Sequence, residues 1–130
     1  MKLRMQEGLA FISGSLTYQG RQLELENVIV DTGSTGSVFS IDKLNTVGFV
    51  AQPKDEIRQV HGVGGVEYVI LRTTDRLSFD ELEVDNFEIE IGAMDYNIAA
   101  DGIVGLDFLR RAGAVIDLAT LVINKHASFN

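Results

Sequence analysis

Short runs of apolar residues, most of them rich in valine, isoleucine and leucine, alternate along the chain with polar residues and glycine. In residues 21–30, Leu23 and Leu25 alternate with glutamine and glutamate, the period-two pattern of a strand with one solvated face. Residues 9–18 form a similar run, and Gln19-Gly20 between the two runs predicts the turn of a β-hairpin. The pattern therefore predicts a mostly β protein.

The remaining strand-like runs are residues 37–39, 57–71 around a glycine-rich tip, 73–79, 82–91, 103–104, 114–118 and 121–124. Two short helical segments interrupt them. The first follows Ser40 as its N-cap and ends near Gly48. The second, residues 106–112, has two arginines in its last turn and Gly113 as its stop. A change of phase around Asn86 predicts a bulge or turn there.

Composition narrows the possible functions. The chain has 130 residues, of which 45% are hydrophobic, so we expect a single domain over residues 1–130. Its 19 acidic and 11 basic residues give a net charge of −8, which disfavours nucleic acid and anionic membrane surfaces as partners. With no cysteine and two histidines, we expect no disulfide, no metal site and no cofactor. No apolar run has the length of a signal peptide or a membrane span, and we therefore expect a cytoplasmic protein.

One stretch combines a buried strand with a carboxylate. Val28-Ile29-Val30 has the composition of a strand covered on both faces, and Asp31-Thr32-Gly33-Ser34 has that of a turn. A carboxyl group at the mouth of a buried strand acquires a raised pKa unless hydrogen bonds or charges offset the burial, as acid–base catalysts require. An ordinary strand-to-turn junction explains the same residues, and this stretch alone leaves both interpretations open.

Glycines also mark the middle of the 57–71 run. Gly62, Gly64 and Gly65 lie at the tip of two strand-like arms. A hairpin with a flexible loop explains this pattern, whereas a phosphate-binding loop is disfavoured because no Lys-Ser/Thr pair follows the glycines.

Taken in order, these pieces resemble the retropepsin-like aspartic proteases over residues 9–124. Ile29-Val30-Asp31-Thr32-Gly33-Ser34 is similar to the apolar-apolar-Asp-Thr/Ser-Gly motif of that family, and Ile103-Val104-Gly105 with a following helix is similar to its second element. The glycine-tipped hairpin lies between the two motifs, where the family has its flap. The resemblance implies a closed or partly open β-barrel with a psi-loop, a glycine-rich flap hairpin and one short C-terminal helix.

The same resemblance implies roles for individual residues. Asp31, Thr32 and Gly33 are the expected catalytic residues, with Thr32 bonding to the partner subunit's backbone and the Gly33 N–H facing the carboxylate. The expected substrate-binding residues of the flap and pocket are Gly62, Val63, Gly64, Gly65, Val66, Ile103 and Val104. The expected psi-loop residues are Asp101, Gly102 and Gly105, with Asp101 capping the Gly102 turn rather than serving as a second catalytic acid.

The chain has a single Asp-Thr-Gly motif, whereas pepsin-type chemistry needs two carboxylates on one water. The resemblance therefore implies a C2 homodimer in which Asp31 and its symmetry mate hydrolyse an extended peptide. One alternative keeps the fold without activity, as a dimerisation or peptide-binding module. Another, a phosphate loop of the sugar-kinase or actin type, needs two lobes larger than this chain can build.

The sequence departs from the family pattern in three places. Ser34 replaces the more frequent alanine, the segment 74–97 is long, and residues 125–130 have no clear equivalent. Among the other charged residues, Glu88 and Glu90 are expected on a solvated face, where they disfavour acidic substrates by long-range repulsion.

Overall fold

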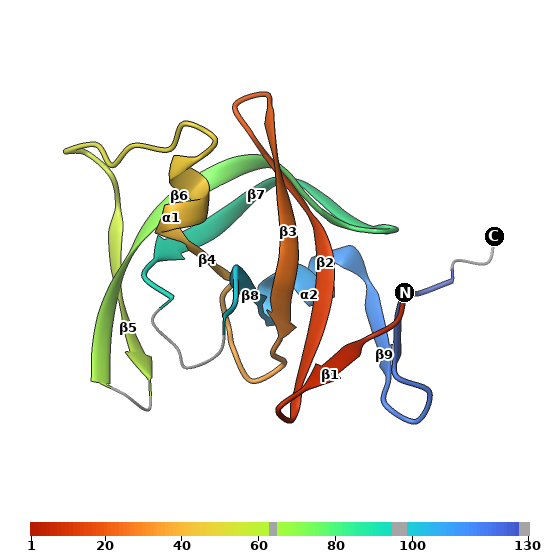
Figure 1. Ribbon diagram of the computed structural model, residues 1–130. Helices are drawn as coiled ribbons and strands as arrows, with labels where there is room; N and C mark the ends of the chain where they lie inside the picture. The colour runs from red at the N-terminus through yellow and green to blue at the C-terminus, as the bar shows by residue number, and fades with distance from the viewer. Residues whose placement is uncertain (63–64, 95–98, 128–130) are drawn as a thin grey trace.

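The computed structural model describes residues 1–62, 65–94 and 99–127, and this part of the chain forms ten strands and two short helices (Figure 1). In chain order the elements are β1 (Arg4–Gln6), β2 (Leu9–Tyr18), β3 (Arg21–Val30), β4 (Val38–Ser40), α1 (Ile41–Asn45), β5 (Ile57–Gly62), β6 (Gly65–Phe79), β7 (Leu82–Gly92), β8 (Gly102–Val104), α2 (Leu106–Ala112), β9 (Ala114–Asp117) and β10 (Val122–Lys125). The mostly β prediction is confirmed. No helix in these ranges is long and apolar enough to cross a membrane.

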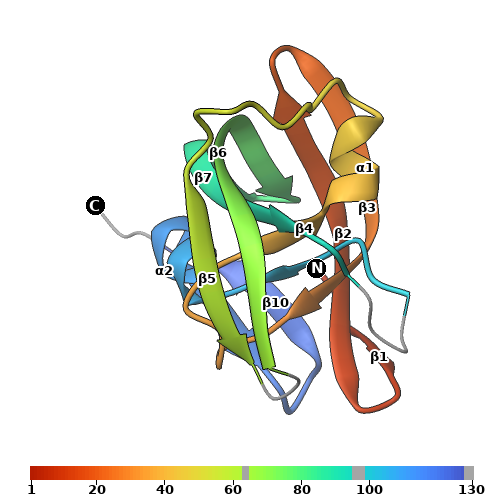
Figure 2. The ribbon, with the colours of Figure 1, turned by 90° about the vertical axis from the view of Figure 1, so that its left-hand side faces the viewer.

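Eight strands form one sheet in the order β1-β2-β3-β8-β4-β7-β6-β5. A further antiparallel pairing joins β2 to β6 over Ser15–Thr17 and closes the middle of this sheet on itself. Strands β1 and β5 remain edges, so the barrel is closed only in part, as Figures 1 and 2 show. The expected partly open barrel is therefore confirmed.

The structure confirms several elements that were predicted from local sequence patterns. Strands β2 and β3 have the predicted bounds, and the turn between them has positive φ at Gln19 (48°) and Gly20 (78°), as a type I′ hairpin turn requires. Helix α2 also has its predicted bounds and ends at Gly113 with a φ of 70°.

Two details of the long β6–β7 hairpin differ from the prediction. Strand β6 runs unbroken over 15 residues, where the sequence indicated separate runs ending at Leu71 and starting at Thr73. The bulge or turn predicted at Asn86 is a single residue with a φ of 50°, and the β6–β7 register is the same on both sides of it. At this point the buried side chains of β7 change from even-numbered to odd-numbered positions, and those of the paired β6 residues change with them. This change explains why the alternation of apolar residues in the sequence shifts by one position near Asn86.

Three central pairings set the position of the candidate site. Strand β8 pairs in parallel with β3 and antiparallel with β4, and β4 pairs in parallel with β7. Because parallel strands end at the same edge of a sheet, the loop after Val30 and the segment after Val104 leave the sheet side by side. Residues 31–37 join β3 to β4 at this edge (Figure 1).

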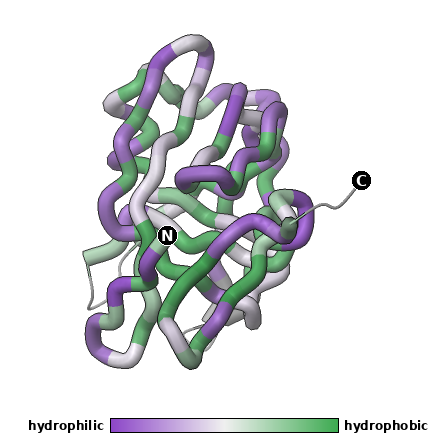
Figure 3. The backbone as a smooth tube through the Cα atoms, turned by 90° about the vertical axis from the view of Figure 1, so that its right-hand side faces the viewer, coloured by the Kyte–Doolittle hydropathy of each residue, from purple (hydrophilic) through white to green (hydrophobic). Residues whose placement is uncertain are grey.

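The hydrophobic core lies inside the partly closed barrel and under α2. Figure 3 shows hydrophobic residues along the strands and hydrophilic ones at several hairpin ends. The rings of Phe79 and Phe87 each contact Phe108 of α2 edge-on, with centroid separations of 5.5 and 5.6 Å. These contacts fix α2 against the long hairpin.

The N-terminal segment lies against the C-terminal hairpin, an arrangement that the sequence analysis did not predict. Strand β1 pairs with β2, and Lys2 forms a bridge with Val122 of β10. Two backbone hydrogen bonds of 2.9 Å, from Leu3 N to Leu121 O and from Ile123 N to Met1 O, hold the two segments together.

Candidate active site

The Asp31 carboxylate lies where two parallel strands end. The backbone N–H of Asp31 donates to the carbonyl of Val104 at 3.0 Å, which fixes Asp31 to the end of β8 as well as to its own strand. The Gly33 N–H donates to Asp31 Oδ1 at 2.9 Å, and the Ser34 N–H donates to the Asp31 carbonyl at 3.2 Å. A Cβ at position 33 would lie 3.2 Å from the same Oδ1, so the glycine leaves the carboxylate room to receive this bond.

The loop that carries Asp31 is fixed to α2 at its far end. The Leu106 N–H donates to the Ser34 carbonyl at 2.8 Å. The Ser37 hydroxyl donates to Asp107 Oδ1 at 2.7 Å and accepts from the Gly105 N–H at 3.0 Å. Ser37 is fully buried, and these bonds satisfy its hydroxyl. The loop is therefore held rigidly at both ends, as a catalytic carboxylate requires.

Gly105 is the point where the loop and the strand–helix connection meet. A Cβ at this position would lie 2.6 Å from the Ser34 carbonyl oxygen and closer still to that of Gly36. Only glycine fits between these two carbonyls. Gly105 is therefore a point where backbone segments come close together. Gly102 is similarly crowded, because a Cβ there would meet the Phe39 ring and the Val38 carbonyl.

Asp101 is a structural residue, with partners other than those predicted. Its Oδ2 accepts hydrogen bonds from the backbone N–H groups of Glu26 (2.9 Å) and Asn27 (3.2 Å), and Lys43 lies 3.6 Å from its Oδ1. The carboxylate therefore holds β3 instead of capping the Gly102 turn. The sequence could not show this, because the partners are about 75 residues apart in the chain.

The two residues predicted as pocket wall on β8 face opposite sides of the sheet. Ile103 is half-buried, and it pairs with Ile29, which precedes Asp31 by two positions and so shares its face. Val104 is fully buried in the hydrophobic core. The assignment of Val104 to the pocket wall is therefore wrong, since side chains alternate along a strand and only one of the two can face Asp31.

The expected flap is the β5–β6 hairpin, which Gly62 and Gly65 close as a directly opposed pair. Its end lies at the same end of the molecule as the 31–37 loop in Figures 1 and 2. Val63 and Gly64 lie outside the described residues. Val66 belongs to β6, where it is paired with His61.

A charged residue that the sequence analysis placed on a solvated face is half-buried beside the loop. The Glu90 side chain is 13% exposed, and its carboxylate lies 3.3 Å from Arg58 Nη1 of β5. Burial raises the pKa of Glu90, and the neighbouring Arg58 offsets this only in part. The prediction of solvation is wrong for Glu90 because β4 and Gly36 cover it, whereas Glu88 is indeed exposed.

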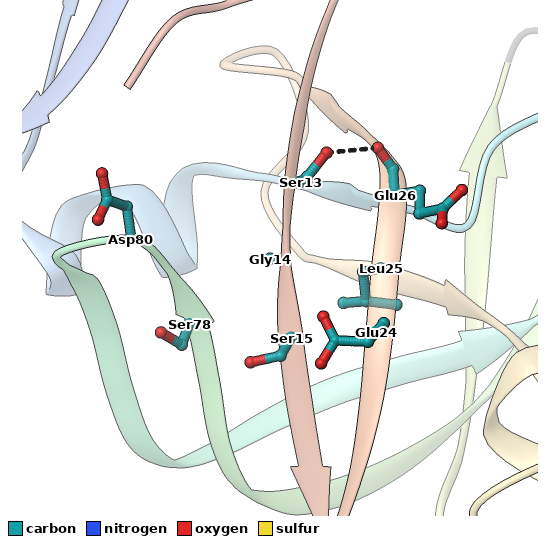
Figure 4. A pocket seen from close by; sticks show the side chains of 8 residues that line it. All are labelled: Ser13, Gly14, Ser15, Glu24, Leu25, Glu26, Ser78 and Asp80. Carbon is teal, nitrogen blue, oxygen red and sulfur yellow. Dashed lines mark hydrogen bonds between the residues drawn. The ribbon is translucent and has the colours of Figure 1, made fainter.

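Two surface hollows are lined by residues other than Asp31. One, of about 440 Å³, is lined by hydroxyl and acidic side chains of β2, β3 and the β6–β7 turn (Figure 4). The Ser13 hydroxyl donates to the Glu26 carbonyl there, and no histidine or lysine lines the hollow to activate a serine. The other, of about 580 Å³, lies between Thr35 and the arginines of α2. Within the described ranges, no three side chains form a cluster able to hold a metal ion.

Comparison with known proteins matches the chain to a protein family and to solved structures. Residues 15–108 match a family model described as aspartyl protease, a region that includes Asp31, the hairpin and Gly105. The fold is similar to that of a retropepsin-like aspartic protease from Rickettsia conorii, with a TM-score of 0.67 and 21% sequence identity. That match covers 94% of this chain and 86% of the other. No curated protein matches the chain.

Proposed function

Because the chain belongs to the aspartyl protease family, we propose that it is an aspartic endopeptidase and that Asp31 supplies its catalytic carboxylate. The observation that carries the proposal is the Asp31 carboxylate at the converging ends of β3 and β8, with the Gly33 N–H 2.9 Å from Oδ1. The combination of Asp31, Thr32 and Gly33 at this junction favours catalysis over a purely structural module, which needs no acid there.

The mechanism needs a second carboxylate, and one chain has a single Asp-Thr-Gly motif. In the proposed C2 homodimer, Asp31 of the partner subunit provides it. Two carboxylates about 3 Å apart cannot both ionise, so the pair shares one proton at acidic pH. Thr32, which is exposed beside Asp31, is available to bond across the axis.

Hydrolysis then follows from the two protonation states. The ionised carboxylate takes a proton from the bound water, and the oxygen of that water attacks the peptide carbonyl carbon. The protonated carboxyl of the pair gives its proton to the carbonyl oxygen. When the tetrahedral intermediate collapses, the C–N bond breaks and the amine nitrogen takes the proton that the first carboxylate received from water. A hydroxyl group of the intermediate gives its proton back to the other carboxylate as the carbonyl re-forms. The Gly33 N–H keeps Asp31 oriented throughout.

The substrate is proposed to be a peptide in extended conformation between the 31–37 loop and the β5–β6 hairpin. Gly62, Val63, Gly64, Gly65 and Val66 would form the flap over it, with Ile103 in the wall below. An extended peptide fits such a site because its backbone hydrogen-bonds to neighbouring chain segments. Closure of the hairpin would also exclude water and strengthen the electrostatic interactions of the dyad.

Incubation with an unstructured protein at about pH 3 to 7 tests the proposal. The wild type should cleave, with a rate that is highest on the acid side, and Asp31→Asn should lower kcat/KM by at least about a thousandfold. Asp80→Asn is the matched control, since Asp80 lies in the exposed β6–β7 turn with a φ of 56°, which asparagine also adopts. A wild type that cleaves nothing over this range would favour the silent dimerisation or peptide-binding module.

The cytoplasmic location stays a prediction.

A further inference from the structure

The paired residues of neighbouring strands show which side chains lie on the same face of the sheet as Asp31. Ile29 and Asp31 share this face, Ile29 is opposite Ile103, and Ile103 is opposite Val38. Val38 is in turn opposite Glu90 on β7. Ile103, Val38 and Glu90 are all half-buried, unlike their neighbours on the core face. A charged residue therefore continues an apolar row that starts beside the candidate catalytic residue.

The Glu90 carboxylate contacts both sides of the proposed substrate groove. Its Oε2 lies 2.8 Å from the place that a Cβ of Gly36 would occupy, so it reaches the loop that begins with Asp31. On the other side it pairs with Arg58, which lies on the β5 arm of the hairpin. Strands β5, β6 and β7 lie side by side in Figure 2, in agreement with their pairing. The acid thus lies between the loop and the hairpin arm, where an extended peptide would pass.

Arg58 offsets the negative charge of Glu90 only in part. Arg58 also lies 3.9 Å from Glu88, so one guanidinium is shared by two carboxylates. Asp107 adds negative potential from α2, and together with Glu88 it raises the pKa of Glu90 beyond the effect of burial. The Arg58 side chain is 52% exposed and can be displaced. A positively charged ligand side chain would therefore gain a favourable interaction here, and a carboxylate would be repelled.

We propose that Glu90 is a specificity-determining residue of the peptide groove, which selects substrates with a lysine or arginine side chain at one position. The proposal rests on the protease function proposed above. Glu90 lies three strand spacings from β3, roughly 14 Å, and successive residues of an extended peptide are about 3.4 Å apart. The selected side chain is therefore expected about two to four residues from the scissile bond.

A set of matched peptides tests this inference. Each peptide carries lysine, glutamine or glutamate at one position, and the position is moved one residue at a time along both sides of the scissile bond. The assay is run at the neutral end of the active pH range, because the raised pKa of Glu90 favours its uncharged form in acid. There we expect kcat/KM of the wild type to favour lysine over glutamate by about tenfold or more at one position, the effect of one partly screened charge contact. Glu90→Gln, which keeps the shape of the side chain, should reduce that ratio to about twofold or less.

Two further variants make the test specific to Glu90. Glu88→Gln removes an equal charge two residues away, on a side chain that is 54% exposed, and it should keep most of the lysine preference. Arg58→Gln removes the competing cation and should increase the preference. Thermal unfolding and circular dichroism would establish that each variant is folded.

The outcomes separate this inference from the proposed function. A wild type that cleaves peptides without preferring lysine at any position, or an undiminished preference in Glu90→Gln, would overturn the role of Glu90. If the wild type cleaves no peptide, the protease proposal fails, and fluorescence polarisation still tests the groove. In that case Asp31→Asn should bind the lysine peptides more tightly than the glutamate peptides. The double variant Asp31→Asn,Glu90→Gln should bind both kinds of peptide about equally. Any other result would overturn the role of Glu90.

Discussion

Ser37 and Asp107 are joined by a hydrogen bond of 2.7 Å, in which the buried Ser37 hydroxyl donates to the Asp107 carboxylate. The same hydroxyl accepts the Gly105 N–H, and Asp107 also accepts the N–H of Phe108 at 2.8 Å. A single side chain thus links the end of the Asp31 loop to the start of α2. The geometry of the candidate site depends on this link.

Replacing Ser37 by alanine tests that dependence. The Gly105 N–H would lose its partner in a buried position, so we expect the free energy of unfolding to fall by about 1–3 kcal/mol. Urea denaturation measures this change, and proteolytic activity should fall with it because the loop loses its anchor. Ser13→Ala is the control, since Ser13 is exposed and its loss should cost about 0.5 kcal/mol or less. Equal stability of the two variants would contradict the role given to Ser37.

Gly105→Ala should be more damaging, because the added methyl group meets two backbone carbonyls that cannot move independently. We expect a loss of about 2–4 kcal/mol in the free energy of unfolding, or no folded protein at all. Gly8→Ala is the matched control, since a Cβ at Gly8 meets nothing within 4 Å and only its φ of 79° is unfavourable. That change should cost about 1 kcal/mol. A Gly105→Ala protein as stable as the control would contradict the close contact.

The proposed dyad predicts a dimer. Light scattering should give twice 14.3 kDa, or 28.6 kDa, at concentrations where the protein cleaves its substrate. Activity per mole of chain should fall on dilution, because a monomer holds one carboxylate of the pair. A monomer that remains fully active at high dilution would rule out the shared water.

The stability of the fold in acid should depend on Asp55. This carboxylate accepts the Gln52 N–H and pairs with Arg72 at 2.5 Å, and these contacts lower its pKa from the ordinary value of 3.8. A carboxyl whose pKa is lower in the folded state adds stability above its unfolded pKa, and that contribution is lost as the pH falls through the folded value. Unfolding measured at several pH values should show Asp55→Asn less stable than the wild type at neutral pH, with the difference shrinking below about pH 4. Asp85→Asn, at an exposed ion pair with Arg76, should change little at any pH.

Elements built from local contacts could be predicted from the sequence, and those built from distant contacts could not. The β2–β3 hairpin depends on its own alternation and on the Gln19-Gly20 turn, and α2 depends on its Gly113 stop. The pairing of β2 with β6 at Ser15–Thr17, which closes the barrel, cannot be predicted from the hydrophobic pattern of either strand.

The candidate site divides in the same way. The motif around Asp31 and the glycine at 105 could be identified because their residue types are restricted by geometry. Glu90 could not be identified from the sequence, because it alternates with buried isoleucines as a solvated residue would. It is covered through the pairing of β7 with β4, a contact between distant segments of the chain. Val104 was misassigned for a related reason, since the face that it presents is set by the pairing with β3. Asp101 was correctly expected to be structural, but its partners on β3 could not be predicted.

The parallel pairing of β3 with β8 also sets the order of events when the protein is made. Asp31 is synthesised early, yet the strand that receives its N–H ends at Val104. Contacts between segments so far apart in the chain form late, because the intervening loop must be closed first. The loop therefore takes its final shape only after most of the polypeptide has been made, and the candidate site is not assembled in a partly synthesised chain.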